Sequence, residues 1–400
     1  MHWLILEDSL ENRTGHWFEY LSGFHRELPH LGDEVTVVVS KRAESFIKNQ
    51  LGGQPLLPES VYLSMSDGAP IWERYARVPF HAYKTFWAVR HILKGSPIVD
   101  VILVPTVIVH HLLGWVLLIK TTFRYQPTKL LLFFPGLPIH KSGTKAMLDG
   151  SASSKLMRFL LHGLAREVQN AKVILGVETQ AMKQAAEEVF GVPFTYFPHP
   201  VALPNQKAEI RKQKTESLTF ACYGPARHEK GSDVLVAAIE EYLKRFPDSR
   251  AKFIVQWLDD FSLPDGNKAR LTESLLQFPQ VEIIHRFFSD GEYARRLSET
   301  EVLLLPYRQS AYGLRVSRVA IEGMIHGLPL ITTRGTTLAA QAEQFGAAIL
   351  CEDGTVDSLV QAMHEMERNF HQLKMLAEQQ KQKAHEHFSV HQFRKTLLAV

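Results

Sequence analysis

The stretch from Leu218 to Asp233 reads L-T-F-A-C-Y-G-P-A-R-H-E-K-G-S-D. Its apolar start predicts a buried strand, and Gly224 predicts a sharp turn before a helix that begins at Ser232. Such a turn directs backbone N–H groups and the positive end of the helix toward an anion. Arg227 and Lys230, three residues apart in this turn, can hold a diphosphate. The alternative is a plain strand-to-helix turn with solvated charges, in which Ser232 or Asp233 caps the helix.

A second informative stretch runs from Leu303 to Thr333 and reads L-L-L-P-Y-R-Q-S-A-Y-G-L-R-V-S-R-V-A-I-E-G-M-I-H-G-L-P-L-I-T-T. It predicts a strand that ends at a proline, a polar loop, and a helix in which Arg315, Arg318 and Glu322 share one face. A carboxylate can accept hydrogen bonds from both hydroxyls of a ribose, and arginines suit phosphate. The alternative is a surface ion pair between Arg318 and Glu322, worth about 0.2–0.5 kcal/mol.

These two motifs, in this order and spacing, resemble the C-terminal domain of glycosyltransferase family 4, which has the GT-B fold. The resemblance extends from Phe197 to Met363 and includes P-H-P-V and the run A-I-L-C-E-D-G-T-V-D-S-L-V-Q-A-M. It implies that Arg227 and Lys230 hold the diphosphate of a UDP- or GDP-linked sugar, and that Glu322 binds the nucleotide ribose. It also implies retention of the anomeric configuration, with no cofactor besides the donor substrate.

The sequence departs from the family pattern in three places. The first glutamate of the family's E-x7-E motif is replaced by Leu314, so another side chain must contact the donor sugar. The candidates for that contact are Tyr312, Arg315 and Ser317. Pro225 follows Gly224 where the family usually has arginine, and Arg227 is its expected substitute. In the first half, Pro135 stands at a strand end where the family often has a histidine.

The first half of the chain predicts one doubly wound domain. Its strands are near-continuous apolar runs, as expected of parallel strands that helices cover on both faces. The predicted strands are Trp3–Leu6, Glu34–Val39, Val101–Val104, Lys129–Phe134 and Val173–Val177. The predicted helices are Trp17–Leu28, Phe86–Leu93, Val107–Lys120 and Lys155–Gln169.

The second half repeats the alternation after a proline-rich and then charged segment, Phe197–Lys214. Besides the two motifs, it predicts a strand at Lys252–Trp257 and helices at Ala269–Gln277, Asp290–Glu299 and Val356–Arg368. We therefore expect an acceptor-binding domain over residues 1–198, a linker over 199–214, and a nucleotide-sugar domain over 215–375. A helical tail over 376–400 is expected to pack on the first domain. In such a pair of facing domains, ligands bind at the carboxyl ends of the strands.

The N-terminal segment Glu7–Tyr20, E-D-S-L-E-N-R-T-G-H-W-F-E-Y, resembles the family more loosely. A glycine at position 15 allows close approach of the backbone to a substrate, so Gly15 is an acceptor-side candidate. The imidazole of His16 can take a proton from an acceptor hydroxyl near neutral pH. The alternative for His16 is packing or capping at the first helix. Further histidines that could serve are His110, His111, His140 and His199.

Composition narrows the class of partner. Lys+Arg 45 against Asp+Glu 42 gives a net charge of +3, which disfavours a nucleic-acid role. Cys222 and Cys351 lie in apolar stretches, where free thiols of a reducing compartment are expected. The first residues, M-H-W-L-I-L-E-D, lack the pattern of an export signal, so we expect a cytoplasmic protein. No Cys/His cluster or H-E-x-x-H motif predicts a metal site.

The apolar segment Val99–Ile119 is long enough to span a membrane, but Asp100, Pro105 and His110 interrupt it. A strand followed by the helix Val107–Lys120 is the better interpretation. Apolar residues cover much of this helix, and the stretch Lys155–Arg166 is apolar and basic. A peripheral contact with the inner face of a membrane therefore stays an alternative.

The sequence thus predicts a metal-independent, retaining glycosyltransferase that moves a sugar from a nucleoside diphosphate sugar to a glycan or lipid-linked acceptor. Surface polysaccharide or glycoconjugate synthesis is the expected setting. One alternative is a sugar-nucleotide epimerase or a phosphorylase on the same fold. The other is a non-catalytic carbohydrate-assembly protein, suggested by Leu314 and Pro135 at positions where the family has polar groups.

Overall fold

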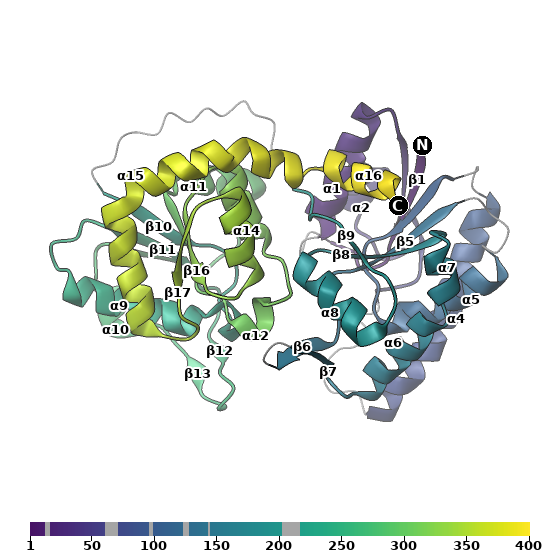
Figure 1. Cartoon of the computed structure of the whole chain (residues 1–400), viewed down its shortest axis with the longest axis horizontal. Helices are drawn as coiled ribbons and strands as arrows, with labels where there is room; N and C mark the ends of the chain where they lie inside the picture. The colour runs from purple at the N-terminus through teal and green to yellow at the C-terminus, as the bar shows by residue number, and fades with distance from the viewer. Residues whose placement is uncertain (13–16, 61–70, 96–98, 123–127, 143–144, 202–216) are drawn as a thin grey trace. The chain divides into compact units, whose positions relative to one another are not determined.

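The computed structural model describes residues 1–12, 17–60, 71–95, 99–122, 128–142, 145–201 and 217–400 (Figure 1). The chain forms two compact units. Unit 1 comprises Met1–Ala202 and Ser389–Val400, and unit 2 comprises Leu203–Phe388. Each unit has its own parallel sheet and its own hydrophobic core.

Unit 1 is built on a seven-stranded sheet with the order β3-β2-β1-β4-β5-β8-β9, in which every pair is parallel. The strands are β1 (His2–Glu7), β2 (Glu34–Ser40), β3 (Gln54–Leu57), β4 (Val101–Val104), β5 (Lys129–Phe134), β8 (Val173–Val177) and β9 (Thr195–Tyr196). The central strands are buried on both faces, which explains their unbroken apolar runs. The predicted doubly wound architecture of this half is confirmed.

Helices surround this sheet: α1 (Trp17–His30), α2 (Ser45–Leu51), α4 (Ile71–Gly95), α5 (Val109–Thr121), α6 (Ala152–His162), α7 (Ala165–Gln169) and α8 (Gln180–Phe190). A small antiparallel pair, β6 (Ile139–Ser142) and β7 (Lys145–Leu148), precedes α6. The single helix predicted over Lys155–Gln169 is wrong, because α6 ends at Gly163 and the buried Leu164 begins a new turn.

Unit 2 is built on a six-stranded parallel sheet with the order β14-β11-β10-β15-β16-β17. The strands are β10 (Thr219–Cys222), β11 (Lys252–Gln256), β14 (Val281–Ile284), β15 (Val302–Leu305), β16 (Leu330–Thr333) and β17 (Ala348–Cys351). β10 lies between β11 and β15, so the loop that follows β10 leaves the middle of the sheet. Cys222 and Cys351 are buried free thiols, as predicted.

The helical elements of unit 2 are η2 (His228–Lys230), α9 (Ser232–Arg245), α10 (Glu273–Leu276), α11 (Asp290–Glu299), α12 (Gln309–Tyr312), α13 (Arg318–Ile325), α14 (Thr337–Phe345) and α15 (Val356–His387). The predicted helix Ala269–Gln277 is wrong. A turn at Gly266, with φ of 86°, instead joins the short antiparallel strands β12 (Phe261–Ser262) and β13 (Lys268–Ala269). Thr272 then caps the four-residue α10.

The last two helices belong to different units. α15 is 32 residues long and packs on α9 in unit 2. After it, α16 (Val390–Ala399) lies against α1 in unit 1 (Figure 1). The centre of the Phe393 ring is 4.9 Å from the centre of the Phe24 ring and 4.6 Å from that of the Phe197 ring. The predicted tail over 376–400 is therefore divided at Phe388, and its final helix completes the core of unit 1.

None of the described helices has the length and apolar content needed to cross a membrane. In α5, where the sequence predicted a broad apolar cover, Leu112 and Trp115 are buried in unit 1. Only Leu117 among the large apolar side chains of α5 is strongly exposed.

Candidate functional site

The loop between β10 and α9 places a lysine ammonium under a glycine. Gly224 has φ of 92°, and a Cβ atom at this position would lie 2.6 Å from Nζ of Lys230. Its backbone N–H donates a hydrogen bond of 2.7 Å to Oε1 of Gln256, which fixes the start of the loop. Gly224 is therefore needed both for the backbone turn and for the room that the ammonium occupies.

Lys230 is a partly buried cation without an acidic partner. Burial lowers the pKa of its ammonium, and the ring of Tyr307 lies 5.9 Å from Nζ. Among the residues that the structure describes, no carboxylate oxygen lies within 4.0 Å of this atom. Because a desolvated charge is costly unless it is paired, this ammonium is suited to an anionic ligand.

Two arginines lie around the same loop. Nη1 of Arg227 is 3.5 Å from Oε1 of Glu229, and Nη1 of Arg315 is 3.8 Å from Oε2 of that glutamate. Both guanidinium groups are more than half exposed. The two arginines thus share one acidic side chain, and Lys230 has no carboxylate oxygen within 4.0 Å among the described residues, so the loop carries a net positive charge. The structure brings Arg227 and Arg315 together at Glu229, in the same loop as Lys230.

The start of α9 is not capped by Ser232 or Asp233, as the alternative interpretation of the sequence expected. Gly231, with φ of 63°, occupies the cap position and makes no side-chain cap. The hydroxyl of Ser232 accepts from the backbone N–H of Arg227 at 3.0 Å. Asp233 pairs with Arg308 at 2.7 Å, so neither predicted cap forms. The first turn of a 14-residue helix is left to face the basic loop, and helix N-termini favour anions.

The segment before α13 holds the remaining donor-side candidates. Arg315 lies before this helix and not on its face, because Ser317 is the cap residue whose hydroxyl accepts from the N–H of Ala320 at 3.3 Å. The ring of Tyr312 is 4.4 Å from that of Tyr307, and burial, then Glu229, raises the pKa of Tyr312 to about 12. Tyr312 is therefore a neutral hydrogen-bonding group beside the basic loop.

Leu314 occupies the position of the first glutamate in the family motif, and it is buried. An apolar, buried side chain therefore stands where the family has a carboxylate. A contact with the donor sugar has to come from a neighbouring side chain.

Glu322 is only 7% exposed, so its pair with Arg318 is not the solvated surface pair of the alternative interpretation. Its Oε1 accepts from Nε of Arg318 at 2.8 Å, and its Oε2 accepts from the hydroxyl of Tyr293. The ring of Tyr293 lies 5.8 Å from that of Tyr223, the residue directly before Gly224. The tyrosines thus connect the carboxylate to the basic loop, and its remaining lone pairs suit a diol.

Tyr293, Tyr307 and Gln256 are site residues that the sequence did not reveal. Each of the three comes from a different strand end or helix. Tyr293 is 29 residues from Glu322, and Gln256 is 32 residues from Gly224. No local spacing marks them. The parallel sheet alone brings them together.

In unit 1, polar groups are buried at the carboxyl ends of the strands. Glu7, at the end of β1, is 1% exposed, and burial, then Asp8, raises its pKa to about 7. Glu178 directly follows β8, and its Oε1 is 2.6 Å from Nδ1 of the buried His199. The hydroxyl of Tyr20, whose ring is 5.2 Å from that of His199, makes no hydrogen bond within the described part of the chain. Doubly wound sheets bind ligands at this edge.

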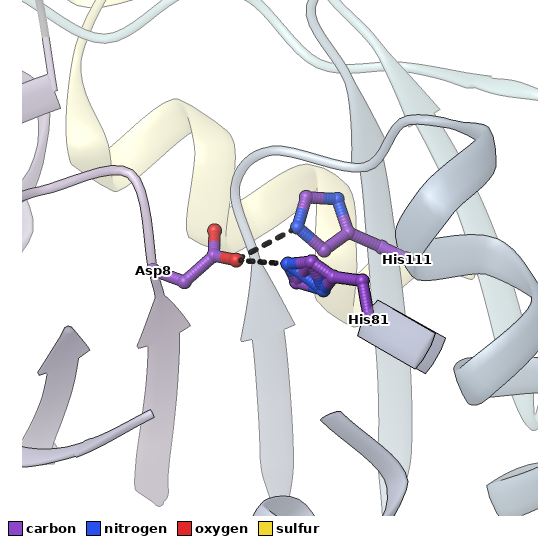
Figure 2. Close-up of side chains that lie close together, drawn as sticks. All are labelled: Asp8, His81 and His111. Carbon is purple, nitrogen blue, oxygen red and sulfur yellow. Dashed lines mark hydrogen bonds and ion pairs between the residues drawn. The ribbon is translucent and has the colours of Figure 1, made fainter. Parts of the chain in front are cut away.

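Figure 2 shows a second cluster at this edge, in which two histidines point at one carboxylate oxygen. Oδ2 of Asp8 is 2.9 Å from Nε2 of His111 and 3.3 Å from Nε2 of His81. The three ligand atoms lie within 4.8 Å of one another, close enough to hold a metal ion. The backbone N–H of Ile108, however, donates to Nδ1 of His111 at 3.3 Å.

That hydrogen bond decides how the cluster is arranged. Since Nδ1 of His111 is an acceptor, Nε2 carries the ring proton and donates it to Asp8. Burial lowers the pKa of His81 to about 4, so its imidazole is neutral. The His111 hydrogen bond therefore ties α5 to the end of β1, while Nε2 of His81 on α4 lies beside the same carboxylate without a hydrogen bond to it. We assign no metal to the cluster.

Two predicted acceptor-side residues, Gly15 and His16, lie outside the described residues. Of the other histidines, His110 and His111 are buried in α5, and His199 is buried next to Glu178. His140 lies in the exposed β6–β7 pair. Pro135 follows β5 directly, so the position where the family often has a histidine is at the same carboxyl edge.

Comparison with known proteins identifies the type of domain. Residues 217–369 match the family described as Glycosyl transferases group 1. No curated protein sequence matches the chain. A glycosyltransferase from Rickettsia africae is similar in structure, with 13% identity and a TM-score of 0.63 over 100% of this chain and 97% of that one.

Two further solved structures are similar over nearly their whole length. HepE from Anabaena, solved with UDP-glucose, shares 12% identity at a TM-score of 0.62, covering 100% of this chain and 98% of its own. An α,α-trehalose-phosphate synthase (UDP-forming) from Burkholderia vietnamiensis shares 12% sequence identity at a TM-score of 0.62. The match covers 100% of this chain and 99% of that one. The chain therefore has the GT-B fold and is a glycosyltransferase, and its residues 217–369 form a domain of the glycosyl transferases group 1 family.

Proposed function

We propose that this protein transfers a sugar from a UDP-linked donor to a hydroxyl group of a glycan or lipid-linked acceptor, with retention of configuration. The observation that carries the donor assignment is the Lys230 ammonium, held under Gly224 with no described carboxylate within 4.0 Å. HepE, which has a similar fold, was solved with UDP-glucose, and the similar trehalose-phosphate synthase is UDP-forming. These support UDP over GDP.

Each donor-side residue has a role that its contacts suit. Lys230 and Arg227 would stabilise the negative charge that develops on the leaving diphosphate, together with the N-terminus of α9. Glu322, already oriented by Tyr293 and Arg318, would accept from the ribose hydroxyls. Tyr312 and Arg315 would contact the sugar or its phosphate in place of the missing glutamate. With fixed cations in these roles, the transfer needs no metal ion.

The acceptor would bind at the carboxyl edge of the unit 1 sheet. Glu7, whose pKa is about 7, can hold an acceptor hydroxyl by a hydrogen bond in either protonation state. His16 stays a predicted acceptor-side base. A lipid-linked acceptor would place the enzyme at the cytoplasmic face of a membrane, in polysaccharide or glycoconjugate synthesis.

The test is release of nucleotide from a panel of UDP-, GDP- and ADP-sugars, with and without acceptor and with EDTA. We expect turnover with a UDP-sugar that EDTA does not change. Arg227→Ala and Lys230→Ala should each lower it roughly a hundredfold. Arg334→Ala, which removes an exposed arginine paired with Glu352, is the matched control. Two loop variants as active as the wild type would show that this loop does not hold the diphosphate.

The stereochemistry is tested separately by NMR of the product. Retention is read from the coupling constant of the anomeric proton after transfer from an α-linked donor. A β-linked product would contradict the retaining mechanism. It would not contradict the assignment of the donor site.

A further inference from the structure

One face of α4 is aromatic and exposed. Phe80, Tyr83 and Trp87 are 59%, 61% and 51% exposed, and their spacing of three and four residues places them in one stripe along the helix. The opposite face of α4 includes the buried Val78, Ala82 and Val89. Large aromatic side chains grouped in this way on a soluble surface mark an interaction site.

The packing of α4 keeps this stripe outward. Gly114 of α5 lies so close to α4 that a Cβ atom on it would be 2.8 Å from the carbonyl oxygen of Ala82. His81, on the inward side of α4, points at Asp8 together with His111 (Figure 2). Because these contacts hold the inward face of α4, the aromatic stripe cannot turn into the core of unit 1.

The charged residues of α4 from Arg77 onward have one sign. From Arg77 to Gly95 the helix has four lysines or arginines and no acidic residue. The whole chain, in contrast, has 45 lysines and arginines against 42 acidic residues. Nζ of Lys84 lies 4.4 Å from the centre of the Phe80 ring, and the Arg90 guanidinium lies 5.7 Å from that of Trp87.

We propose that this stripe, Phe80, Tyr83 and Trp87 with Lys84, Arg90 and Lys94, docks the protein on an anionic lipid surface. Tyrosine and tryptophan combine an apolar ring with a polar atom and favour the headgroup region of a bilayer. Long basic side chains can bury their stems beside the rings and keep their charges at the lipid phosphates. The helix lies on the membrane, consistent with the finding that no described helix can cross one.

This docking names the surface that would hold the enzyme at the membrane of the proposed function. Its test does not depend on sugar transfer, because the stripe contains none of the donor-site residues. The stripe also differs from the surface that the sequence suggested. The apolar residues of Val107–Lys120 are largely buried in α5, whereas the exposed aromatic side chains lie on α4.

The test is co-sedimentation of the full-length protein with vesicles, without any sugar nucleotide. We expect at least about tenfold more binding to phosphatidylcholine vesicles containing phosphatidylglycerol than to phosphatidylcholine alone, and a decrease at high salt. The triple variant Phe80→Ser/Tyr83→Ser/Trp87→Ser should lose this binding. Met375→Ser/Leu376→Ser, which removes two exposed apolar side chains of α15, should keep it.

A second variant distinguishes loss of membrane binding from misfolding of the triple variant. Lys84→Glu/Lys94→Glu leaves the aromatic rings in place and should lower binding to anionic vesicles at least about tenfold, with an unchanged melting temperature. The proposal is overturned by equal binding to both vesicle types, or by a triple variant that binds like the wild type. It is also overturned if the wild type binds no vesicles but forms a dimer that the triple variant lacks.

Discussion

Lys230 is the residue on which the donor assignment depends. A cation that is partly buried and unpaired is retained at a cost to stability, and that cost is recovered when an anion binds. The same side chain should therefore affect the stability of the free protein and that of the nucleotide-bound protein in opposite directions.

We predict that Lys230→Met leaves the free energy of unfolding unchanged or raises it by up to about 1 kcal/mol. The same variant should lose the stabilisation that UDP gives the wild type. Urea unfolding with and without UDP measures both effects, with Arg334→Met, at an exposed arginine outside the loop, as the control. A clear loss of stability with UDP still stabilising would count against the assignment.

The two loop glycines should respond differently to alanine. At Gly231 a Cβ atom would lie 2.1 Å from the carbonyl oxygen of Pro306, so Gly231→Ala should cost about 2–3 kcal/mol of unfolding free energy. At Gly224 the new atom would meet only the flexible end of Lys230. Gly224→Ala should cost about 1 kcal/mol and weaken nucleotide binding strongly.

Chemical unfolding and UDP titration of both variants test this difference. Equal stability losses, or a Gly224→Ala variant that binds UDP like the wild type, would show that Lys230 does not need the space under Gly224.

How much of the site was predictable depends on where its residues lie in the chain. Arg227, Lys230 and Glu322 belong to local motifs whose spacing is visible in the sequence, and the structure places them as groups in one unit. Tyr293 could not be predicted, because its contact with Glu322 depends on the order of strands in the sheet. Arg315 was placed wrongly on the helix because the hydroxyl that caps α13 belongs to Ser317, two residues later.

At the scale of elements, α16 is held to unit 1 by a buried charge pair as well as by Phe393. The Asp33 carboxylate accepts from Arg394 at 2.6 and 3.0 Å and from the Trp3 indole at 2.9 Å. Burial alone would raise the pKa of Asp33, but the hydrogen bonds, Arg394 first, outweigh it and lower that pKa from 3.8 to about 2.

This pair predicts a pH-dependent stability. Because the pKa of Asp33 is lower in the folded than in the unfolded chain, its contribution is complete above about pH 4 and is lost as the pH falls toward about 2. The shift corresponds to about 2 kcal/mol. Asp33→Asn should therefore be less stable than the wild type near neutral pH, with the difference shrinking in acid.

Unfolding free energies measured across this range check the prediction, with Arg394→Met as the partner variant. A difference between wild type and Asp33→Asn that stays constant down to about pH 2 would contradict it.

The inner strands of both sheets could be predicted, because burial on two faces makes them apolar and short. The edge strands β3 and β9 of unit 1 were not predicted. The helices were harder. α4 is 25 residues long, yet only its later part was predicted, since its exposed face is as apolar as a buried one. α10 was mistaken for a longer helix because the turn at Gly266 is a local event that hydrophobic periodicity does not report. The polar helix α15 was predicted to end early, although its packing on α9 supports it further.

At the scale of the whole molecule, the chain is two doubly wound units whose chemistry is divided between them. Unit 2 carries the basic loop and the buried Glu322, which together suit a nucleoside diphosphate sugar. Unit 1 carries the polar carboxyl edge with Glu7 and the exposed face of α4. This division predicts that donor binding is a property of unit 2 residues and is unaffected by variants of the α4 stripe.

The central claim is that a nucleoside diphosphate binds between Lys230 and Glu322, and a thermal-shift panel tests it most directly. The full-length protein is heated with UDP, GDP, ADP and their common sugars, with and without magnesium. A ligand at a hundredfold its Kd should stabilise the folded protein by about 2.7 kcal/mol. We predict a rise in melting temperature with UDP and UDP-sugars that is independent of magnesium, lost in Glu322→Ala and in Lys230→Met, and kept in Glu352→Ala. A rise that both site variants retain, or no rise with any nucleotide, would contradict the account.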